Sequence, residues 1–315
     1  MLKNAISFSI IIPTYNRPAQ LVNCLTALAD QQYSKQQAFE VIVVNDGGAS
    51  VDSAIRPFQQ DLTITLINQQ NTGPAQARNQ GAAAAQGDFL VFTDDDCRPA
   101  PDWLQQLAKH CERLGYEEQS SKIAVMIGGQ TINTLSKNLY SVASQMIVDL
   151  AYQYFNPQPS QARFFASNNM VFPREPFLKI GGFHPAFRTS EDREICDRWL
   201  RSGYRMQYVS DVKIYHAHRL SLASFWRQHL SYGRGAFRYH TIRTQRGEPP
   251  FRPDLSFQKQ ILIQPFKRLS LPQAVVVAGL MCLSQAASLV GYQQERRRQT
   301  AERLCETLLP IGFTK

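Results

Sequence analysis

Short apolar runs and longer amphipathic stretches alternate along the first hundred residues, and this alternation constrains the fold more than any other feature of the chain. Strands that alternate with helices favour a doubly wound, mostly parallel α/β sheet. In such a sheet, ligands bind beyond the carboxyl ends of the strands. The patterns predict strands at 7–12, 40–44, 62–66 and 89–92, and helices at 18–30, 51–59 and 74–86.

The pattern after residue 100 is less regular. It predicts helices at 101–114, 139–154 and 191–202, strands at 123–127, 205–209 and 212–216, and a strand at 164–172 that is broken at 167–169. From residue 220 onward the chain is predicted to be helical and basic. We therefore expect two domains, an α/β domain over residues 1–218 and a C-terminal helical extension over 219–315.

Polar residues directly follow three of the predicted strands. Residues 13–17 read Pro-Thr-Tyr-Asn-Arg, residues 45–48 read Asn-Asp-Gly-Gly, and residues 93–96 read Thr-Asp-Asp-Asp. Because parallel strands end at the same edge of a sheet, the three clusters predict one rim of one ligand crevice.

The three consecutive acids Asp94, Asp95 and Asp96 end the apolar run at 89–92. Three like charges at a strand exit repel one another unless a counter-ion is present. Mg²⁺ and Mn²⁺ prefer carboxylate oxygens and leave room for substrate phosphates. The triplet therefore predicts a metal-dependent enzyme with a phosphorylated donor, and a solvated acidic turn is the alternative.

Two further residues of the rim are suited to bind a nucleotide. Asp46 can accept a hydrogen bond from the N3–H of a pyrimidine base, although Asn-Asp-Gly-Gly also forms Asx turns. Arg78 follows the Gly73-Pro74 helix start, and its planar guanidinium can bind a base or phosphates. A surface salt bridge is the alternative role for Arg78.

The segments 11–17, 43–48, 77–81 and 92–96 together resemble the family 2 glycosyltransferases, and the resemblance continues through 181–183, 190–192 and 203–204. It covers about residues 7–218. It implies a GT-A fold, a nucleoside diphosphate sugar donor, a bound metal, and inversion at the anomeric carbon. Residues that match nucleotide-binding positions are Pro13, Tyr15, Arg17, Asp46 and Arg78, and neighbouring Thr14 is included with them. Asp94 and Asp95 match acids that bind ribose or metal, and Asp96 matches the principal metal ligand.

The pair Glu191-Asp192 follows Ser190 at the start of a predicted helix. The family pattern makes Asp192 the catalytic base, while Glu191 can orient the acceptor. The chemistry agrees, because an inverting transfer needs a carboxylate to take the acceptor hydroxyl's proton while a metal neutralises the leaving diphosphate. Capping of the helix N-terminus is the alternative role for the pair.

His216 and His218 lie two residues apart, so a strand would place both on one face. His216 is the better candidate for a third metal ligand beside Asp96 and Asp94, and a structural role is the alternative. The Gln-x-x-Arg-Trp signature of the family's processive members is not found, although Gln228 and residues 232–235 lie in a comparable stretch. We therefore expect transfer of a single sugar.

Charge and cysteine content indicate where the protein works. With 43% hydrophobic and 19% charged residues the chain is globular. The six cysteines have no paired spacing, which fits reduced thiols in the cytoplasm. The apolar stretch at 6–12 is stopped by Pro13 and reads as a strand, not a signal peptide.

The net charge is −3 over residues 1–200 and +12 over 201–315, so the C-terminal third is expected to face a polyanion.

No charged residue occurs between 269 and 294, and basic clusters at 267–268 and 296–298 flank this stretch. Such a segment is attracted to an anionic membrane surface, whereas no motif for reading nucleic acid is present. We expect peripheral or re-entrant membrane contact through 258–298, at the inner face of the cell membrane. A buried helix is the second reading, and a membrane span the third.

The sequence thus predicts a Mn²⁺- or Mg²⁺-dependent inverting glycosyltransferase that uses a UDP-sugar and a glycan or lipid-linked acceptor, in cell-surface polysaccharide or glycolipid synthesis. Two alternatives belong to other classes. A sugar nucleotidyltransferase would carry a glycine-rich, basic loop after the first strand. A non-catalytic nucleotide- and membrane-binding scaffold would bind the donor without releasing its diphosphate.

Overall fold

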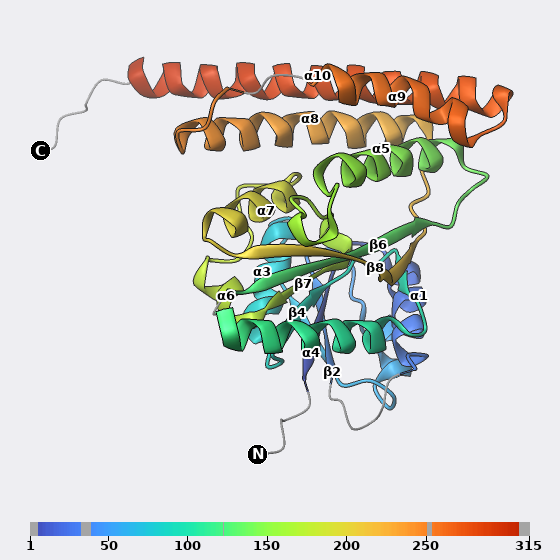
Figure 1. Cartoon of the computed structure of the whole chain (residues 1–315), viewed down its shortest axis with the longest axis vertical. Helices are drawn as coiled ribbons and strands as arrows, with labels where there is room; N and C mark the ends of the chain where they lie inside the picture. The colour runs from blue at the N-terminus through green and yellow to red at the C-terminus, as the bar shows by residue number, and fades with distance from the viewer. Residues whose placement is uncertain (1–5, 33–38, 122, 251–253, 309–315) are drawn as a thin grey trace, which may run out of the picture. The chain divides into compact units, whose positions relative to one another are not determined.

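The computed structural model describes residues 6–32, 39–121, 123–250 and 254–308. Its centre is one mixed sheet of eight strands in the order β3-β2-β1-β4-β7-β6-β8-β5 (Figure 1). The strands are β1 (Phe8–Thr14), β2 (Phe39–Asn45), β3 (Ile64–Asn68), β4 (Phe89–Phe92), β5 (Cys97–Pro99), β6 (Val125–Asn133), β7 (Met170–Pro173) and β8 (Arg205–His216). The predicted α/β class, a doubly wound sheet followed by helices, is confirmed.

The first half of the sheet is parallel, and the second half is mixed. Strand β1 pairs in parallel with β2 and β4, and β2 with β3. Strand β7 runs antiparallel to both β4 and β6, and β5 runs antiparallel to β8. The sequence missed β5, because three residues after the acidic triplet carry no strand periodicity.

Several predicted strands differ in extent from those observed. Residues 205–209 and 212–216 form one continuous strand, β8, whose register against β6 shifts between Gly129 and Gln130. The shift absorbs the polar residues that suggested a break. In the predicted segment 164–172, the expected break at Ser167–Asn169 is a turn of 3₁₀ helix, and only the part after it forms a strand, β7.

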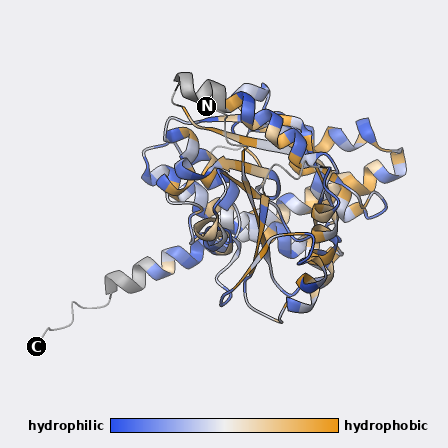
Figure 2. Ribbon diagram, turned by 90° about the horizontal axis from the view of Figure 1, so that it is seen from below, coloured by the Kyte–Doolittle hydropathy of each residue, from blue (hydrophilic) through white to orange (hydrophobic). Residues whose placement is uncertain are grey.

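Alternate side chains of the central strands enter two separate hydrophobic cores. One core contains Ile10, Ile12 and Val91, and is covered by α1 (Pro18–Ala29), α2 (Asp52–Ile55) and α4 (Trp103–Ser121). The other contains Ile11 and Phe92, and is covered by α3 (Pro74–Ala84), α6 (Arg174–Lys179) and α7 (Glu191–Arg201). Burial on both faces explains why these strands are hydrophobic along most of their length (Figure 2).

An aromatic cluster fixes the loop that precedes α7. The ring of Phe92 lies 5.8 Å from Phe172, 5.2 Å from Phe177 and 5.1 Å from Phe183, measured between ring centroids. Asn79 of α3 clamps the same loop, since it donates to the Phe183 carbonyl at 2.7 Å and accepts from the Phe183 amide at 2.8 Å. The end of β4 and the start of α7 are thereby tied together.

The chain divides into two compact units. Residues 1–137 and 148–218 form the first, and residues 138–147 and 219–315 form the second. We call them the sheet unit and the helical unit. The helical unit contains the start of α5 (Leu139–Phe155) together with α8 (Leu222–Gln245), α9 (Leu255–Arg268) and α10 (Leu271–Leu308). The expectation that 1–218 and 219–315 are separate domains stays a prediction.

Helix α10 packs against α8 with backbones in direct contact. A Cβ added at Gly233 would lie 1.9 Å from the Ser288 carbonyl oxygen, and one at Gly291 would lie 1.9 Å from the Leu230 oxygen. Within α10, residues Leu271–Glu302 are long and apolar enough to cross a bilayer, and a third of their most apolar window is buried. Core helices of globular proteins share these properties, so length and composition alone do not place the helix in a membrane.

Candidate active site

Parallel pairing brings the three polar clusters to one edge of the sheet. In the register of β1 and β2, Thr14 lies opposite Asn45, and on the other side of β1 Ile11 lies opposite Phe92. Thr14 donates a hydrogen bond to Asp95 Oδ2 at 2.8 Å. The rim expected from the strand ends therefore exists, and β1 and β4 contribute side chains that touch across it.

Each acid of the triplet has a different set of partners. Asp94 binds Arg78 Nη2 at 2.6 Å. Asp95 binds Thr14 and Arg17, whose Nη1 lies 3.2 Å from both Asp95 Oδ1 and Asp96 Oδ2. The repulsion among three aspartates is thus offset by two arginines, one on each side of the triplet.

The carboxyl end of β8 lies next to Asp96, the third acid of the triplet. His216 Nε2 lies 3.3 Å from Asp96 Oδ1, and His218 Nδ1 lies 3.7 Å from Asp96 Oδ2. The antiparallel pairing of β5 with β8 produces this contact, because Cys97 lies directly opposite His216. The sequence singled out both histidines but could not place them, since 120 positions separate Asp96 from His216.

Burial and neighbouring charges separate the acidities of Asp95 and Asp96. Burial raises the pKa of Asp95 to about 6, although Arg17 and the Thr14 hydroxyl oppose the rise. Burial alone would also raise the pKa of Asp96, but the hydrogen bond and charge of His216, with Arg17 and His218, hold that pKa below its usual range. Asp96 is therefore ionised at any physiological pH.

The donor atoms around Asp96 fit a divalent cation. Ligand atoms of Asp96, Cys97 and His216 lie within 4.8 Å of one another. Among the described residues, these three side chains form the cluster that could hold a metal ion. Carboxylate and imidazole donors suit Mn²⁺. Burial and the charges of Asp96 and Asp94 raise the pKa of the Cys97 thiol well above its usual range, which disfavours the thiolate, and Mn²⁺ and Mg²⁺ prefer oxygen donors to a thiolate. Asp94, predicted as a further ligand, is instead held by Arg78, and its metal role stays a prediction.

Arg78 connects the triplet to the Glu191-Asp192 pair. The residue is 3% exposed, and its guanidinium binds Asp94 through Nη2 and Glu191 through Nη1, the latter at 3.0 Å. The ring of Phe183 packs on it at 5.7 Å. Its Nε is buried without a hydrogen-bond partner among the described residues. Arg78 is a buried bridge, not a surface ion pair.

Asp192 lies in the first turn of α7, two residues after Ser190, whose backbone is strained. Ser190 adopts φ +66° in the left-handed region, and its side chain makes no capping hydrogen bond. Asp192 accepts a hydrogen bond from the Arg193 amide at 2.7 Å. Burial, followed by the charge of Glu191, raises the pKa of Asp192 to about 7. A carboxylate with that pKa can exchange a proton near neutral pH, as a general base requires.

Asp46 is buried at the end of β2 and organises the turn before α3. It accepts hydrogen bonds from the Thr72 and Gly73 amides, both at 2.9 Å, and from Gln69 Nε2 at 2.6 Å. This turn places Pro74 at the first position of α3 and so fixes the direction of Arg78. Asp46 therefore has a structural role, but through the distant 69–73 turn and not through the local Asx turn given as its alternative. Its contact with a base stays a prediction.

The remaining predicted nucleotide residues line the end of β1. Pro13 lies in the strand, and Tyr15 follows it with 49% of its surface exposed, so its ring is free to meet a ligand. Asn16, which belongs to the predicted cluster 13–17 but was given no role of its own, adopts φ +53° and accepts from the Ala49 amide at 3.0 Å. The sequence missed Ser167, whose hydroxyl lies 3.5 Å from Glu191. The only sequence signal for Ser167 was the polar interruption at 167–169.

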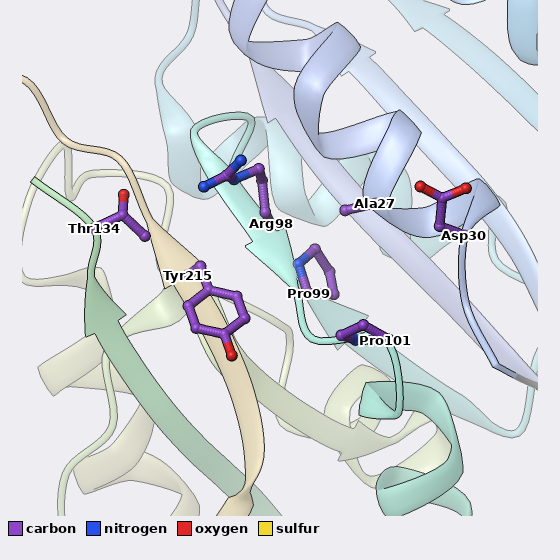
Figure 3. A pocket seen from close by; sticks show the side chains of 7 residues that line it. All are labelled: Ala27, Asp30, Arg98, Pro99, Pro101, Thr134 and Tyr215. Carbon is purple, nitrogen blue, oxygen red and sulfur yellow. The ribbon is translucent and has the colours of Figure 1, made fainter.

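The sheet unit also has a pocket of about 480 Å³ that is separate from this site (Figure 3). Arg98 and Tyr215 line it, and they alternate with Cys97 and His216 along the paired strands β5 and β8. None of the residues that line the pocket belongs to the acidic triplet, to the Glu191-Asp192 pair or to the two histidines.

Comparisons with known proteins agree with this geometry. The family model for "Glycosyl transferase family 2" matches residues 9–181, and that for "N-terminal domain of galactosyltransferase" matches residues 147–220. The chain is 25% identical to the pre-mycofactocin glycosyltransferase of Mycobacterium tuberculosis over 72% of its own length and 46% of that protein. It is 37% identical to the glycosyltransferase AglE of Haloferax volcanii, over 65% of this chain and 64% of that one.

Solved structures show the same fold. The mannosyltransferase PcManGT of Pyrobaculum calidifontis, in complex with GDP-Man and Mn²⁺, superposes with a TM-score of 0.63 at 20% identity, covering 93% of this chain and 88% of that one. S. aureus TarS 1-349 with UDP-GlcNAc gives 0.54 at 15% identity, over 94% and 92%. The predicted GT-A fold is confirmed. With the family model matched over more than half of its length, the chain belongs to glycosyltransferase family 2.

Proposed function

We propose that the protein is a metal-dependent, inverting glycosyltransferase that moves one sugar from a nucleoside diphosphate sugar to an acceptor hydroxyl. The observation that carries this proposal is the double contact of Arg78, which holds the first acid of the triplet and the neighbour of Asp192 in one buried cluster. A donor-binding rim and a candidate base are therefore close enough to act on one substrate.

Asp96 and His216 would hold Mn²⁺ or Mg²⁺, with Asp94 or Asp95 in reach of the same ion or of the donor's ribose. When bound, the metal supplies positive charge that offsets the charge of the leaving diphosphate. Arg17 lies 3.2 Å from both Asp95 and Asp96 and adds a second positive charge on the same side.

Asp192 performs the proton transfer in this proposal. Its carboxylate accepts the proton of the acceptor hydroxyl as that oxygen bonds to the anomeric carbon and the bond to the diphosphate breaks. Glu191 is held by Arg78 and Ser167, so it is poorly placed to accept a proton. Its negative charge instead raises the pKa of Asp192.

A uridine donor is favoured. Asp46 Oδ2 accepts one protein hydrogen bond, from the Gly73 amide, and a carboxylate oxygen can accept another from a base N3–H. The structural neighbours carry both UDP-GlcNAc and GDP-Man, so both bases belong in the test. Relatives of similar sequence include a hyaluronan synthase and a chondroitin synthase, which supports a role in polysaccharide synthesis. Cell-surface glycolipid synthesis and a place at the inner face of the cell membrane belong to the same proposal.

A thermal-shift panel of UDP-, GDP- and dTDP-sugars, with and without Mn²⁺, tests donor binding directly. We expect one UDP-sugar to raise the melting temperature only when the metal is present. Diphosphate release in the presence of candidate glycan and lipid-linked acceptors then tests transfer, with Asp192→Asn as the inactive control. Binding without release by any acceptor would favour the scaffold alternative, and absence of any shift would exclude a nucleotide-sugar enzyme.

A further inference from the structure

Helix α9 has one exposed face that carries three apolar residues and one lysine. Leu255, Lys259, Leu262 and Phe266 are spaced by four, three and four residues, so they lie on one side of the helix. All four are exposed, with Leu255 at 82% and Phe266 at 50%. Ile261 and Pro265, on the other side, are buried. The exposed side therefore shows more apolar surface than a solvated helix requires.

Helix α10 repeats this arrangement. Leu271, Val275 and Leu289 are exposed by 57–70% and share one face by helical spacing. The same face continues through the exposed Gln293 to Arg296, and Arg297 lies beside it. We call these two faces of α9 and α10, with the basic residues at their ends, the amphipathic surface.

The opposite face of α10 is locked to α8. Besides the close backbone contacts at Gly233 and Gly291, the part-buried Arg238 forms an ion pair with the buried Glu295 at 2.8 Å. Insertion of α10 across a bilayer would separate this pair and the touching backbones. The contacts therefore favour a helix that stays on α8 and offers only its outer face to a partner.

The charge of the amphipathic surface indicates which kind of partner it binds. Exposed cations of the amphipathic surface are Lys259, Lys267, Arg268, Arg296 and Arg297. On α9 and on α10 as far as Glu302, the carboxylates are already engaged: Asp254 caps α9, Glu295 binds Arg238 and Arg298, and Glu302 binds Arg298. A second copy of the chain would bring these cations against one another, whereas an anionic surface complements them.

We propose that the amphipathic surface binds the headgroup layer of an anionic bilayer, with α9 and α10 lying along the membrane instead of crossing it. Apolar side chains such as Leu262 and Phe266 enter the acyl boundary, and the cations meet lipid phosphates. This proposal is independent of the transfer reaction, because it concerns a surface that contributes no residue to the candidate active site.

Flotation of the full chain with vesicles tests the proposal. We expect binding to vesicles of phosphatidylglycerol and phosphatidylcholine, little binding to phosphatidylcholine alone, and release by high salt. Each cation near an anionic surface contributes roughly fivefold to partitioning, so Arg296→Gln with Arg297→Gln should lower it about 25-fold. The matched control, Arg56→Gln with Arg113→Gln, removes two exposed arginines from the sheet unit and should bind as the unchanged protein does.

A second pair of variants tests the apolar contribution. Leu262→Ser with Phe266→Ser replaces exposed side chains, so it should fold normally by circular dichroism and yet float several-fold less.

Equal binding to neutral vesicles, equal loss in the control, or no binding at all would each overturn the proposal. Retention after an alkaline carbonate wash would indicate a span. A concentration-dependent dimer in ultracentrifugation that is lost in the serine variant would identify a second copy as the partner. Donor-induced melting shifts on the same samples report separately on the proposed enzyme.

Discussion

Arg78 Nη1 and Glu191 Oε1 lie 3.0 Å apart, although 113 positions separate the two residues in the chain. Both side chains are buried, and Arg78 simultaneously binds Asp94 at 2.6 Å. The pair joins the helix after β3 to the helix that carries Asp192. It thereby couples the donor rim to the candidate base through a single guanidinium.

Arg78 should contribute far more to stability than an exposed arginine does. Arg78→Met leaves Glu191 buried without its partner and is expected to cost about 3–5 kcal/mol in the free energy of unfolding. Adding Glu191→Gln should recover part of that loss, because the unpaired buried charge is removed. Urea unfolding measures all three variants. Arg201→Met, which breaks the more exposed pair with Asp197, is the control and should cost less than about 1 kcal/mol. Equal costs would contradict the buried-bridge description.

Asp192→Asn should abolish transfer while leaving the fold intact. Loss of a general base typically lowers the rate by about 10²–10⁴-fold. Because burial and Glu191 raise the pKa of Asp192 to about 7, its ionised form destabilises the folded protein progressively as pH rises from about 4 to 7. The Asn variant should therefore melt at the same temperature as the unchanged protein, or higher, at pH 8. Full activity in a normally melting Asn variant would refute the base assignment.

The pH dependence of kcat/KM should report the same group. Activity is expected to rise as pH passes about 7, since only the carboxylate form of Asp192 accepts a proton. Glu191→Gln removes the neighbouring negative charge, so the rising limb should move to lower pH. Asp197→Asn removes a charge from the same helix that is paired with Arg201, and should leave the limb in place. A limb that stays unmoved in Glu191→Gln would mean that another group titrates.

Asp96 should control metal-dependent donor binding, and neighbouring Cys97 should not. Asp96→Asn is expected to eliminate the Mn²⁺-dependent melting shift with a sugar nucleotide, and His216→Gln to weaken it. Cys97→Ser replaces a protonated thiol in the same cluster and should retain the shift. Isothermal titration with Mn²⁺ and donor provides the affinities. Equal losses in Asp96→Asn and Cys97→Ser would argue for a thiolate-containing site.

Three glycines of the helical unit should respond differently to alanine. Gly279 of α10 has open space where a Cβ would lie, so Gly279→Ala should raise the free energy of unfolding by about 0.5–1 kcal/mol through helix propensity. Gly233→Ala and Gly291→Ala place a methyl group against a carbonyl of the facing helix and should cost about 1–3 kcal/mol. Thermal unfolding followed by circular dichroism distinguishes them. A stabilised Gly291→Ala would show that α8 and α10 are not in close contact.

The sequence by itself determined the central strands and the ligand rim. Apolar runs such as 89–92 are local signals, because a strand buried on both faces must be hydrophobic throughout, and its polar end must then lie at the sheet's edge. Motif order along the chain was likewise sufficient to indicate the family. The GT-A fold, the cluster of residues at the carboxyl ends of β1, β2 and β4, and the helical C-terminal extension could all be expected before any coordinates.

Only the tertiary structure decided which side chains meet. Strand β5 has three residues and no periodicity, yet its pairing with β8 is what brings His216 to Asp96. Arg78 could not be assigned to Glu191 from spacing, and α10 could not be placed on α8 from its composition. The physical reason is the same in these cases. Ion pairs and close helix contacts depend on which distant segments the topology brings together, and the local sequence around either residue carries no signal of that pairing.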